Sequence, residues 1–205
     1  MITILDYGLG NPESVSNMIR RLGVNAVISS DKDKIEHAKL LIIPGVGHFA
    51  RAMENLKSMD LLDILNHKAL VQQTPVLGIC LGMQLFFEHS EEGNVDGLGW
   101  IPGVVKKFNL VHPDMKIPHM GWTEVICQNN SPLFMDQEEP LRYYFVHSYH
   151  VVCGQNQYAI ASANYGYSFT CAARKDNITG VQFHPEKSHL YGFRFFQRYF
   201  KFISL

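Results

Sequence analysis

The stretch from Pro75 to Glu88, PVLGICLGMQLFFE, constrains the fold of this chain more than any other part of its sequence. It begins with a short apolar run over residues 76–79, which is typical of a buried strand. Cys80 follows between Gly78 and Gly82, and the apolar residues after Gly82 recur with helical spacing. The pattern therefore predicts a strand, a tight turn and a helix, with a thiol at the turn.

The Gly-x-Cys-x-Gly spacing is the thiol counterpart of the nucleophile elbow, in which glycines permit a strained backbone and close approach of neighbouring chain and substrate. Cys80 would then lie at the carboxyl end of a strand and the amino end of a helix. The helix dipole and the free N–H groups of the first turn favour a thiolate there over a thiol. The alternative is that Cys80 is a small buried apolar residue and that the glycines only let helix and strand pack closely.

A second segment, GVQFHPEKS from Gly180 to Ser188, favours the interpretation of Cys80 as a nucleophile. His184 precedes Pro185, which disfavours the helical region for it and holds it extended. In an extended chain His184 and Glu186 point to the same side, so one segment offers an imidazole with a carboxylate beside it. The acid of such a triad orients the imidazole and stabilises its protonated form. We expect Cys80, His184 and Glu186 to form a catalytic triad.

Several motifs make this chain similar to a known family. GICLGMQ and QFHPEKS, together with PGVG at 44–47, resemble the class I (triad-type) glutamine amidotransferases. Within that group the chain resembles, from end to end, the glutaminase subunit of imidazole glycerol phosphate synthase. The further motifs that carry this resemblance, in the family's order, are DYGLGN near the start, PGVGHFARAM, GLGWIPG, IPHMGW and YYFVHSYHV.

The resemblance implies a flavodoxin-like α/β fold, with one domain over residues 1–205 and a central mixed, mostly parallel sheet flanked by helices. It implies an enzyme that hydrolyses L-glutamine to glutamate and ammonia through the triad, without a cofactor or a metal. It also implies a heterodimer with a (β/α)₈ cyclase subunit, which would use the channelled ammonia in histidine biosynthesis.

Hydrolysis of a carboxamide needs two donors for the oxyanion of the tetrahedral intermediate. The elbow predicts the N–H of Leu81 as one donor. The PGVG segment predicts the second, from the backbone of Val46 or Gly47, although such a segment alone is more often an ordinary turn at a strand end. Gly45 and Gly47 permit a peptide flip around Val46, so we expect low activity until the partner and its ligand complete the oxyanion hole.

The resemblance assigns the glutamine pocket to Gln84 and to backbone groups of Ser148 and Tyr149. Gln84 has an independent reason to be there, because it lies four residues after Cys80 and therefore on the same face of a helix. The alternative for Gln84 is an ordinary solvent-exposed glutamine of a helix.

The resemblance also assigns residues to the route of the ammonia and to the partner. It places Tyr144 and Lys187 at the ammonia exit, and His119 and Trp122 toward the partner subunit. From their sequence context alone, Trp122 and Tyr144 would be interpreted as core aromatic residues.

Short apolar runs alternate with amphipathic patterns over the first 90 residues, which implies a parallel sheet with helices on both faces. Strands are expected at 2–5, 24–28, 40–43 and 76–79, and helices around 15–22, 31–38, 49–57 and 60–72. The loops that leave the carboxyl ends of these strands, including DYGLGN and PGVG, should face one common site. After residue 92, closely spaced strand-like runs predict antiparallel strands added to the sheet, among them 143–152, and residues 190–202 predict a core helix.

Composition excludes several classes of function. A formal net charge of −1 offers no basic field for nucleic acid or anionic lipid. The start of the chain has no targeting pattern and its apolar runs are far short of a membrane span, so we expect a cytoplasmic protein. The four cysteines and ten histidines show no disulfide or metal-ligand spacing, so three of the cysteines are expected in the core and no metal is expected.

The acceptor of the ammonia stays open at this point. Pro12-Glu13 stands where the family usually has Leu-Arg after GN, which reverses a charge in a loop expected near the partner. NMIRRLG, VISSD, NYGYSF and EKSHLYG look more like a paralogous branch that supplies ammonia for amidination of a surface-polysaccharide sugar. The histidine pathway is the first hypothesis and this branch the alternative. A thiol hydrolase, or a non-catalytic binding module of the same fold, is the competitor from another class.

Overall fold

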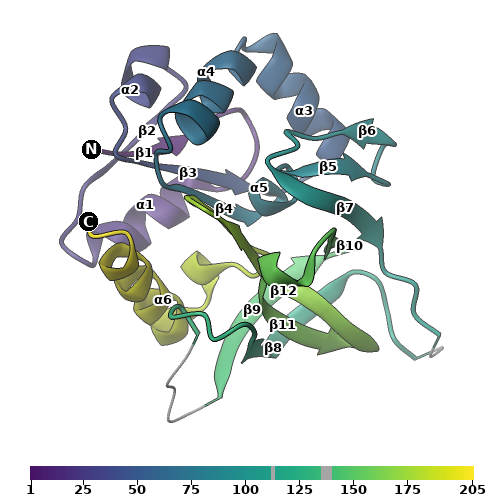
Figure 1. Cartoon of the computed structure of the whole chain (residues 1–205). Helices are drawn as coiled ribbons and strands as arrows, with labels where there is room; N and C mark the ends of the chain where they lie inside the picture. Colours follow the sequence, from purple (N-terminus) through teal and green to yellow (C-terminus); the bar gives the residue numbers. More distant parts are fainter. Residues whose placement is uncertain (112–113, 135–139) are drawn as a thin grey trace.

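The computed structural model describes residues 1–111, 114–134 and 140–205 (Figure 1). Five strands form a parallel part of the sheet, in the order β2-β1-β3-β4-β13. Their bounds are Ile2–Leu5 for β1, Ala26–Ser29 for β2, Leu40–Gly45 for β3, Val76–Cys80 for β4 and Ile178–Val181 for β13. Because β13 pairs with β4, a segment from near the end of the chain lies directly beside the strand that ends in Cys80.

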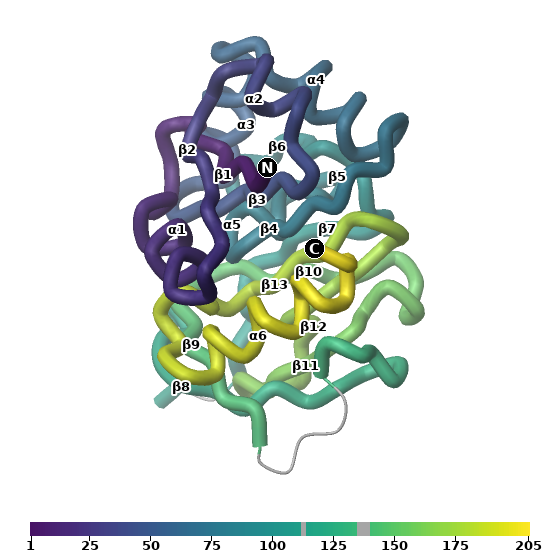
Figure 2. The backbone as a smooth tube through the Cα atoms, turned by 90° about the vertical axis from the view of Figure 1, so that its left-hand side faces the viewer, coloured from purple at the N-terminus to yellow at the C-terminus, as the bar shows by residue number. Residues whose placement is uncertain are grey.

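Helices cover both faces of this parallel part. Successive residues of β3 belong to two separate buried clusters, because side chains alternate across a strand. One cluster includes side chains of α1 (Pro12–Arg20) and α6 (His189–Phe202), and the other includes side chains of α2 (Lys32–Glu36), α3 (Phe49–Ser58) and α4 (Leu62–Asn66). In Figure 2, α2, α3 and α4 gather at the top of the view, and α6 lies lower, near α1.

The rest of the sheet is mostly antiparallel and extends from β13 in the order β12-β10-β7-β5-β6, with β11, β8 and β9 branching from β12. The bounds are Phe87–Ser90 for β5, Val95–Asp96 for β6, Ile101–Lys107 for β7, His119–Cys127 for β8, Leu141–His147 for β9, Tyr149–Cys153 for β10, Ala159–Tyr165 for β11 and Tyr167–Lys175 for β12. The predicted α/β fold, with a parallel centre and added antiparallel strands, is confirmed. No helix among the described residues is long and apolar enough to cross a membrane.

The helix after Cys80 is shorter than its apolar spacing predicts. α5 spans only Leu81–Gln84, and the chain then enters β5, which pairs in parallel with β7. Phe86 is fully buried and its ring stacks on Trp100 at a centroid distance of 5.1 Å. Pairing and packing with a later part of the chain thus override the helical pattern, which extends over too few residues to stand alone.

Two other predicted elements are divided. The helix expected over 60–72 becomes α4 followed by a π-helical turn, His67–Val71, in which Lys68 is buried. The Lys68 ammonium donates to Glu36 O, Ala38 O and Gln72 Oε1, which satisfies all three of its protons. The strand expected over 143–152 is divided at Ser148 into β9, which pairs with β8, and β10, which pairs with β7.

Candidate active site

Cys80 adopts a strained backbone conformation at the end of β4. Its φ is 55° and its ψ is −109°, a region that L residues rarely occupy. Gly82, two residues later, packs against β3 so closely that an added Cβ would lie 1.8 Å from the carbonyl oxygen of Ile43. The predicted elbow is therefore present, and at residue 82 only glycine fits.

His184 and Glu186 lie just beyond β13, beside the end of β4. His184 Nδ1 is 2.7 Å from Glu186 Oε1, and the two side chains are only 1% and 3% exposed. His184 is extended, as its position before a proline predicts, whereas Glu186 lies on a short 3₁₀ turn, Pro185–Lys187, rather than on extended chain. The expected pairing of imidazole and carboxylate holds, but the 3₁₀ turn provides it.

The hydrogen bonds define the state of the His184 ring. A carboxylate only accepts, so Nδ1 carries the proton that it donates to Glu186. Nε2 is buried and has no hydrogen-bond partner among the described residues. Burial opposes protonation of the ring, but the negative charge of a Cys80 thiolate and the bond to Glu186 outweigh it and raise the pKa of His184. His184 is thus placed to take the thiol proton and to hold it as an imidazolium.

The thiol opens into a cavity of about 240 Å³. This volume is below the roughly 300–1,000 Å³ of sites for drug-sized ligands, and it suits a molecule the size of an amino acid. The residues that line it are Val46, Gly47, Cys80, Leu81, Gln84, Glu92, Pro118, Val146, His147, Ser148 and Tyr149. All the residues that the sequence analysis assigned to the oxyanion hole and the glutamine pocket therefore meet here.

The PGVG segment leaves β3 directly beside the nucleophile, since Gly45 pairs with Cys80 in the sheet. A Cβ on Gly45 would lie 2.7 Å from both the Leu81 Cβ and the Tyr7 Oη. Tyr7, from the DYGLGN loop, is fully buried, and its hydroxyl has no hydrogen-bond partner in the described part of the chain. Burial, together with the Cys80 charge, raises the pKa of this phenol. The first loop therefore packs against the segment expected to supply an oxyanion donor.

Gln84 is buried rather than exposed to solvent. Its Nε2 donates to the carbonyl of Tyr149 at 3.0 Å and to Gln182 Oε1 at 3.0 Å. Both amide protons are thereby used, so Gln84 has only its Oε1 left to offer a ligand in the cavity. A ligand N–H is what this oxygen would bind.

Glu92 is a site residue that the sequence analysis missed. Among the described residues it is the only carboxylate that lines the cavity, and its Oε2 also accepts the backbone N–H of Phe49 at 2.8 Å, at the start of α3. α3 has no side-chain cap from His48, the residue at its N-cap, so Glu92 supplies an acceptor from another loop. No local pattern marks this residue, because its position depends on a contact across 43 residues.

His119 and His147 form a buried chain behind the cavity. His147 Nδ1 donates to Tyr149 O at 2.8 Å, so its Nε2 accepts from His119 Nδ1 at 2.9 Å, and His119 Nε2 accepts from the Thr123 hydroxyl at 2.8 Å. Burial lowers the pKa of His147 to about 3 and that of His119 to about 4, so both rings are neutral. His119 is 2% exposed, so its side chain points inward, and its assignment toward the partner stays a prediction.

The other residues assigned to the ammonia route and the partner lie near the surface. Trp122 is 40% exposed and stacks on His189 with a centroid distance of 5.7 Å and an interplanar angle of 6°. Tyr144 is half-buried and packs edge-on against Trp122, and its carbonyl accepts the backbone N–H of His184 at 2.9 Å. Lys187 is exposed on the turn that carries Glu186. Trp122 and His184 are thus both in direct contact with Tyr144.

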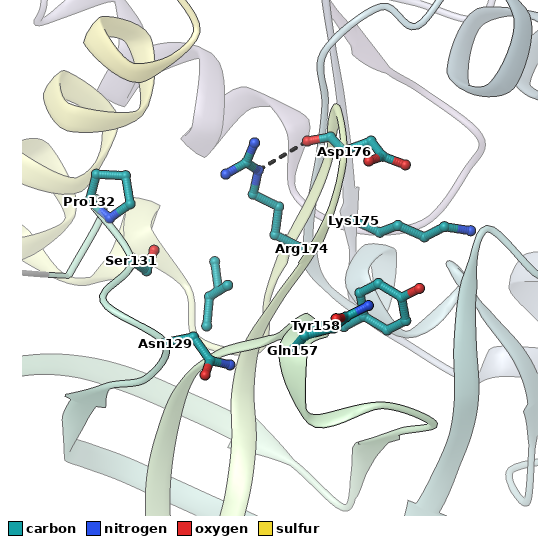
Figure 3. A pocket seen from close by; sticks show the side chains of 9 residues that line it. Asn129, Ser131, Pro132, Gln157, Tyr158, Arg174, Lys175 and Asp176 are labelled. Atoms are coloured by element: carbon teal, nitrogen blue, oxygen red, sulfur yellow. Dashed lines mark hydrogen bonds between the residues drawn. The ribbon is translucent and has the colours of Figure 1, made fainter.

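A larger cavity, of about 350 Å³, lies away from the triad between residues 129–132, 157–160 and 174–176 (Figure 3). Its two cations already have partners. Arg174 Nε donates to Asp176 O at 3.0 Å and its guanidinium lies 4.4 Å from the ring centre of Phe202, and Lys175 Nζ donates to Trp100 O at 3.0 Å. We therefore place the candidate active site at the smaller cavity.

Comparison with known proteins agrees with this geometry. Residues 3–197 match the family model described as glutamine amidotransferase class-I. The chain is 47% identical over 201 residues to imidazole glycerol phosphate synthase subunit HisH 2 of Methanococcus maripaludis, covering 98% of this chain and 99% of that one. It is 42% identical over 203 residues to the subunit HisH 2 of Pseudomonas aeruginosa, covering 99% and 100%.

Solved structures agree in fold. A crystal structure of a glutamine amidotransferase superposes with a TM-score of 0.74 at 15% identity, covering 100% of this chain and 99% of that one. The PurLQS structure from Thermotoga maritima gives a TM-score of 0.67 at 19% identity, covering 98% of each chain. With the family match over nearly the whole length and the Cys80, His184 and Glu186 geometry, we conclude that this chain belongs to the class I glutamine amidotransferase family, in the group of the HisH subunits.

Proposed function

We propose that this chain is the glutaminase subunit of an imidazole glycerol phosphate synthase, which hydrolyses glutamine and passes the ammonia to a cyclase partner in histidine biosynthesis. The observation that carries the chemistry is the strained Cys80 beside the buried His184 and Glu186 pair, at a cavity the size of an amino acid. Relatives 41–47% identical over nearly their whole length bear the name of this subunit, which supports the pathway.

The reaction follows from the positions of these groups. The Cys80 sulfur attacks the side-chain carbonyl carbon of glutamine, and the carbonyl oxygen takes the negative charge between the N–H of Leu81 and a second N–H from Val46 or Gly47. The His184 imidazolium gives its Nε2 proton to the departing nitrogen, so ammonia leaves and a glutamyl thioester remains. Water then gives a proton to Nε2 and attacks the thioester, which releases glutamate and restores the thiolate.

The cavity also explains how glutamine would be recognised. Glutamine carries an α-ammonium group, and Glu92 is the one negatively charged side chain that the described part of the chain places on the cavity wall. Gln84 adds its free Oε1, a second acceptor that suits the same N–H donors. Glu92 and Gln84 would therefore bind the α-ammonium end while the carboxamide end reaches Cys80.

A glutaminase of this kind needs a partner, because free ammonia is protonated and lost at neutral pH. We assign that role to a (β/α)₈ cyclase subunit in a heterodimer. The exposed Trp122, stacked on His189 and next to Tyr144, offers an aromatic contact close to the triad. With Gly45 and Gly47 around Val46, the oxyanion segment can change its peptide orientation, so activity should be low in the isolated subunit. A cytoplasmic location belongs to the same proposal, since the nucleophile is a thiol.

The paralogous role in amidination of a sugar is not favoured. Its support was the Pro12-Glu13 departure together with the four motifs named in the sequence analysis, and the structure gives the Pro12-Glu13 pair a local reason. Asn11 caps α1 by accepting the N–H of Ser14 at 3.0 Å, Pro12 is the first helical residue, and Glu13 lies in the first turn, where the helix dipole favours an acid. The relatives described above carry the name of the histidine-pathway synthase.

The test combines the purified chain with the cyclase subunit of a histidine-pathway synthase and its ribotide ligand, and measures glutamate from glutamine. We expect turnover with the partner, little without it, and none with Cys80→Ala. Cys127→Ala is the matched control, because this half-buried thiol at the end of β8 is not among the residues that line the cavity, and its loss should leave turnover unchanged. Glutamate production by Cys80→Ala would refute the nucleophile.

A second experiment tests the pathway. A strain that lacks its own glutaminase subunit is given this gene and scored for growth without histidine on ammonia-poor medium. Growth supports the histidine-pathway role. Failure of growth, with the chain soluble and active as a glutaminase, would assign the ammonia to another acceptor and leave the triad unaffected.

A further inference from the structure

Gln182 occupies a position next to the nucleophile that the triad does not explain. It directly follows β13 and lies two residues before His184, and its side chain is fully buried. Its backbone N–H donates to Cys171 O at 2.8 Å, which holds the residue against the neighbouring strand β12. A fully buried amide must find hydrogen-bond partners, so its contacts are informative.

The side chain of Gln182 bridges two residues of the active site. Its Nε2 lies 3.5 Å from Cys80 Sγ, within reach of an N–H hydrogen bond to sulfur, and its Oε1 accepts from Gln84 Nε2 at 3.0 Å. Cys80 and Gln182 are 102 residues apart in sequence, and the pairing of β4 with β13 brings them together.

The direction of these bonds follows from a backbone carbonyl. The Tyr149 oxygen can only accept, and Gln84 approaches it at 3.0 Å, so Gln84 must present its nitrogen there. The same nitrogen faces Gln182, which must therefore present its oxygen to Gln84. The remaining group of Gln182, its NH₂, is consequently the one that faces the sulfur. His147 Nδ1 donates to the same carbonyl at 2.8 Å and helps to hold it in place.

The sulfur lies between two groups that prefer opposite protonation states. The carbonyl of Val146 is 3.9 Å from Cys80 Sγ and can accept only from the protonated thiol. The Gln182 N–H donates to the sulfur, and a hydrogen bond to a charged acceptor is roughly twice as strong as one to a neutral acceptor. Gln182 therefore favours the thiolate, and it does so without a charge that would repel the His184 imidazolium.

We infer that Gln182 is a further catalytic residue, whose carboxamide N–H stabilises the Cys80 thiolate and orients the sulfur, and that Gln84 is the positioning residue that keeps this amide correctly oriented. The inference rests on Cys80 being the nucleophile, as in the proposed function, and needs neither a particular ammonia acceptor nor a partner. It gives Gln84 two roles, because one residue both lines the substrate cavity and fixes the donor to the sulfur.

The test is the pH dependence of alkylation of Cys80 by iodoacetamide, followed on the Cys80 peptide by mass spectrometry in the full chain without glutamine. Gln182→Met keeps the length of the side chain and removes the donor. We expect its alkylation midpoint to rise by about one pH unit, which is roughly a tenfold fall in the ratio of thiolate to thiol at a fixed pH. Gln182→Glu, close in shape, should raise the midpoint further, because a carboxylate repels the thiolate.

Thr179→Val is the matched control, since Thr179 is buried on β13 and the substitution removes a hydroxyl with almost no change in shape. A merely structural role for Gln182 would lower stability in both Gln182 variants and leave their alkylation midpoints where the midpoint is in the parent chain and in Thr179→Val. Gln84→Glu, which loses the donor to Gln182, should raise the midpoint as well. An unchanged midpoint in folded Gln182→Met, or in Gln182→Glu where the methionine variant does not fold, would overturn the inference. Absence of glutamine turnover in the parent chain with its partner, together with the expected midpoint shifts in the variants, would instead count against the proposed function.

Discussion

The bond between Glu186 and His184 makes a quantitative prediction for the pH profile of the enzyme. Glu186→Gln replaces a buried carboxylate, 2.7 Å from Nδ1, by a neutral amide that can still accept a hydrogen bond. A hydrogen bond to a charged group contributes about 1.5–3 kcal/mol, and one pKa unit corresponds to about 1.36 kcal/mol. The substitution should therefore lower the pKa of the imidazolium by about one to two units.

The sign of the effect on activity follows from the reactive form. The reactive form is a Cys80 thiolate beside a His184 imidazolium. On the alkaline side His184 loses its proton, so this ion pair is lost. In the parent chain the thiolate and Glu186 raise the pKa of His184 against the opposing effect of burial, so the alkaline limb of kcat/KM should lie at high pH. In Glu186→Gln that limb should move down by about one to two pH units.

The assay is the initial rate of glutamate formation at low glutamine, in the presence of the partner, between pH 6 and about pH 10, which covers the unfolded-state value of about 6.5 and the raised value. Glu91→Gln is the matched control, because Glu91 is exposed and accepts the backbone N–H of Lys107 away from the triad. Superimposable alkaline limbs for Glu186→Gln and the parent would refute the role of Glu186. The free energy of unfolding depends on pH with the same sign. The raised pKa of His184 gives its full stabilisation below about pH 6.5, and this stabilisation is lost as the pH rises through the raised pKa.

Three further substitutions test separate parts of the site. Glu92→Gln should raise KM for glutamine about tenfold or more with little change in kcat, because an ionic contact to the α-ammonium group is lost, and an unaltered KM would exclude that contact. Gly82→Ala should lower the free energy of unfolding in urea by about 3 kcal/mol or prevent folding, since its Cβ would lie 1.8 Å from Ile43 O, and a stable variant would contradict the packing. Tyr7→Phe should leave the free energy of unfolding unchanged or raise it by about 1 kcal/mol, because it removes a buried hydroxyl without a described partner; a loss of more than about 1 kcal/mol would show that the hydroxyl is bonded.

The local parts of the site could be predicted because each is encoded within a few residues. The elbow depends on Cys80 and its flanking glycines, and the histidine and its carboxylate are two residues apart. Alternating apolar patterns in the first half predicted β1 to β4 and the helices between them, since a buried strand and an amphipathic helix differ in the period of their side chains. The boundaries between elements were predicted less accurately, as the division of one expected strand at Ser148 shows.

What only the tertiary structure decided are the contacts between segments distant in sequence. Hydrophobic pattern and turn chemistry act over a few residues, whereas the pairing of β4 with β13 unites positions 102 residues apart. That pairing places Gln182 against the sulfur, and other long-range contacts bring Glu92 into the cavity. The short α5 has the same cause, because strand pairing with β7 and packing against Trp100 outweigh a local helical preference. The amino-acid sequence by itself thus determined the fold class and the three chemical groups of the triad, while the surroundings that tune them arose from tertiary packing.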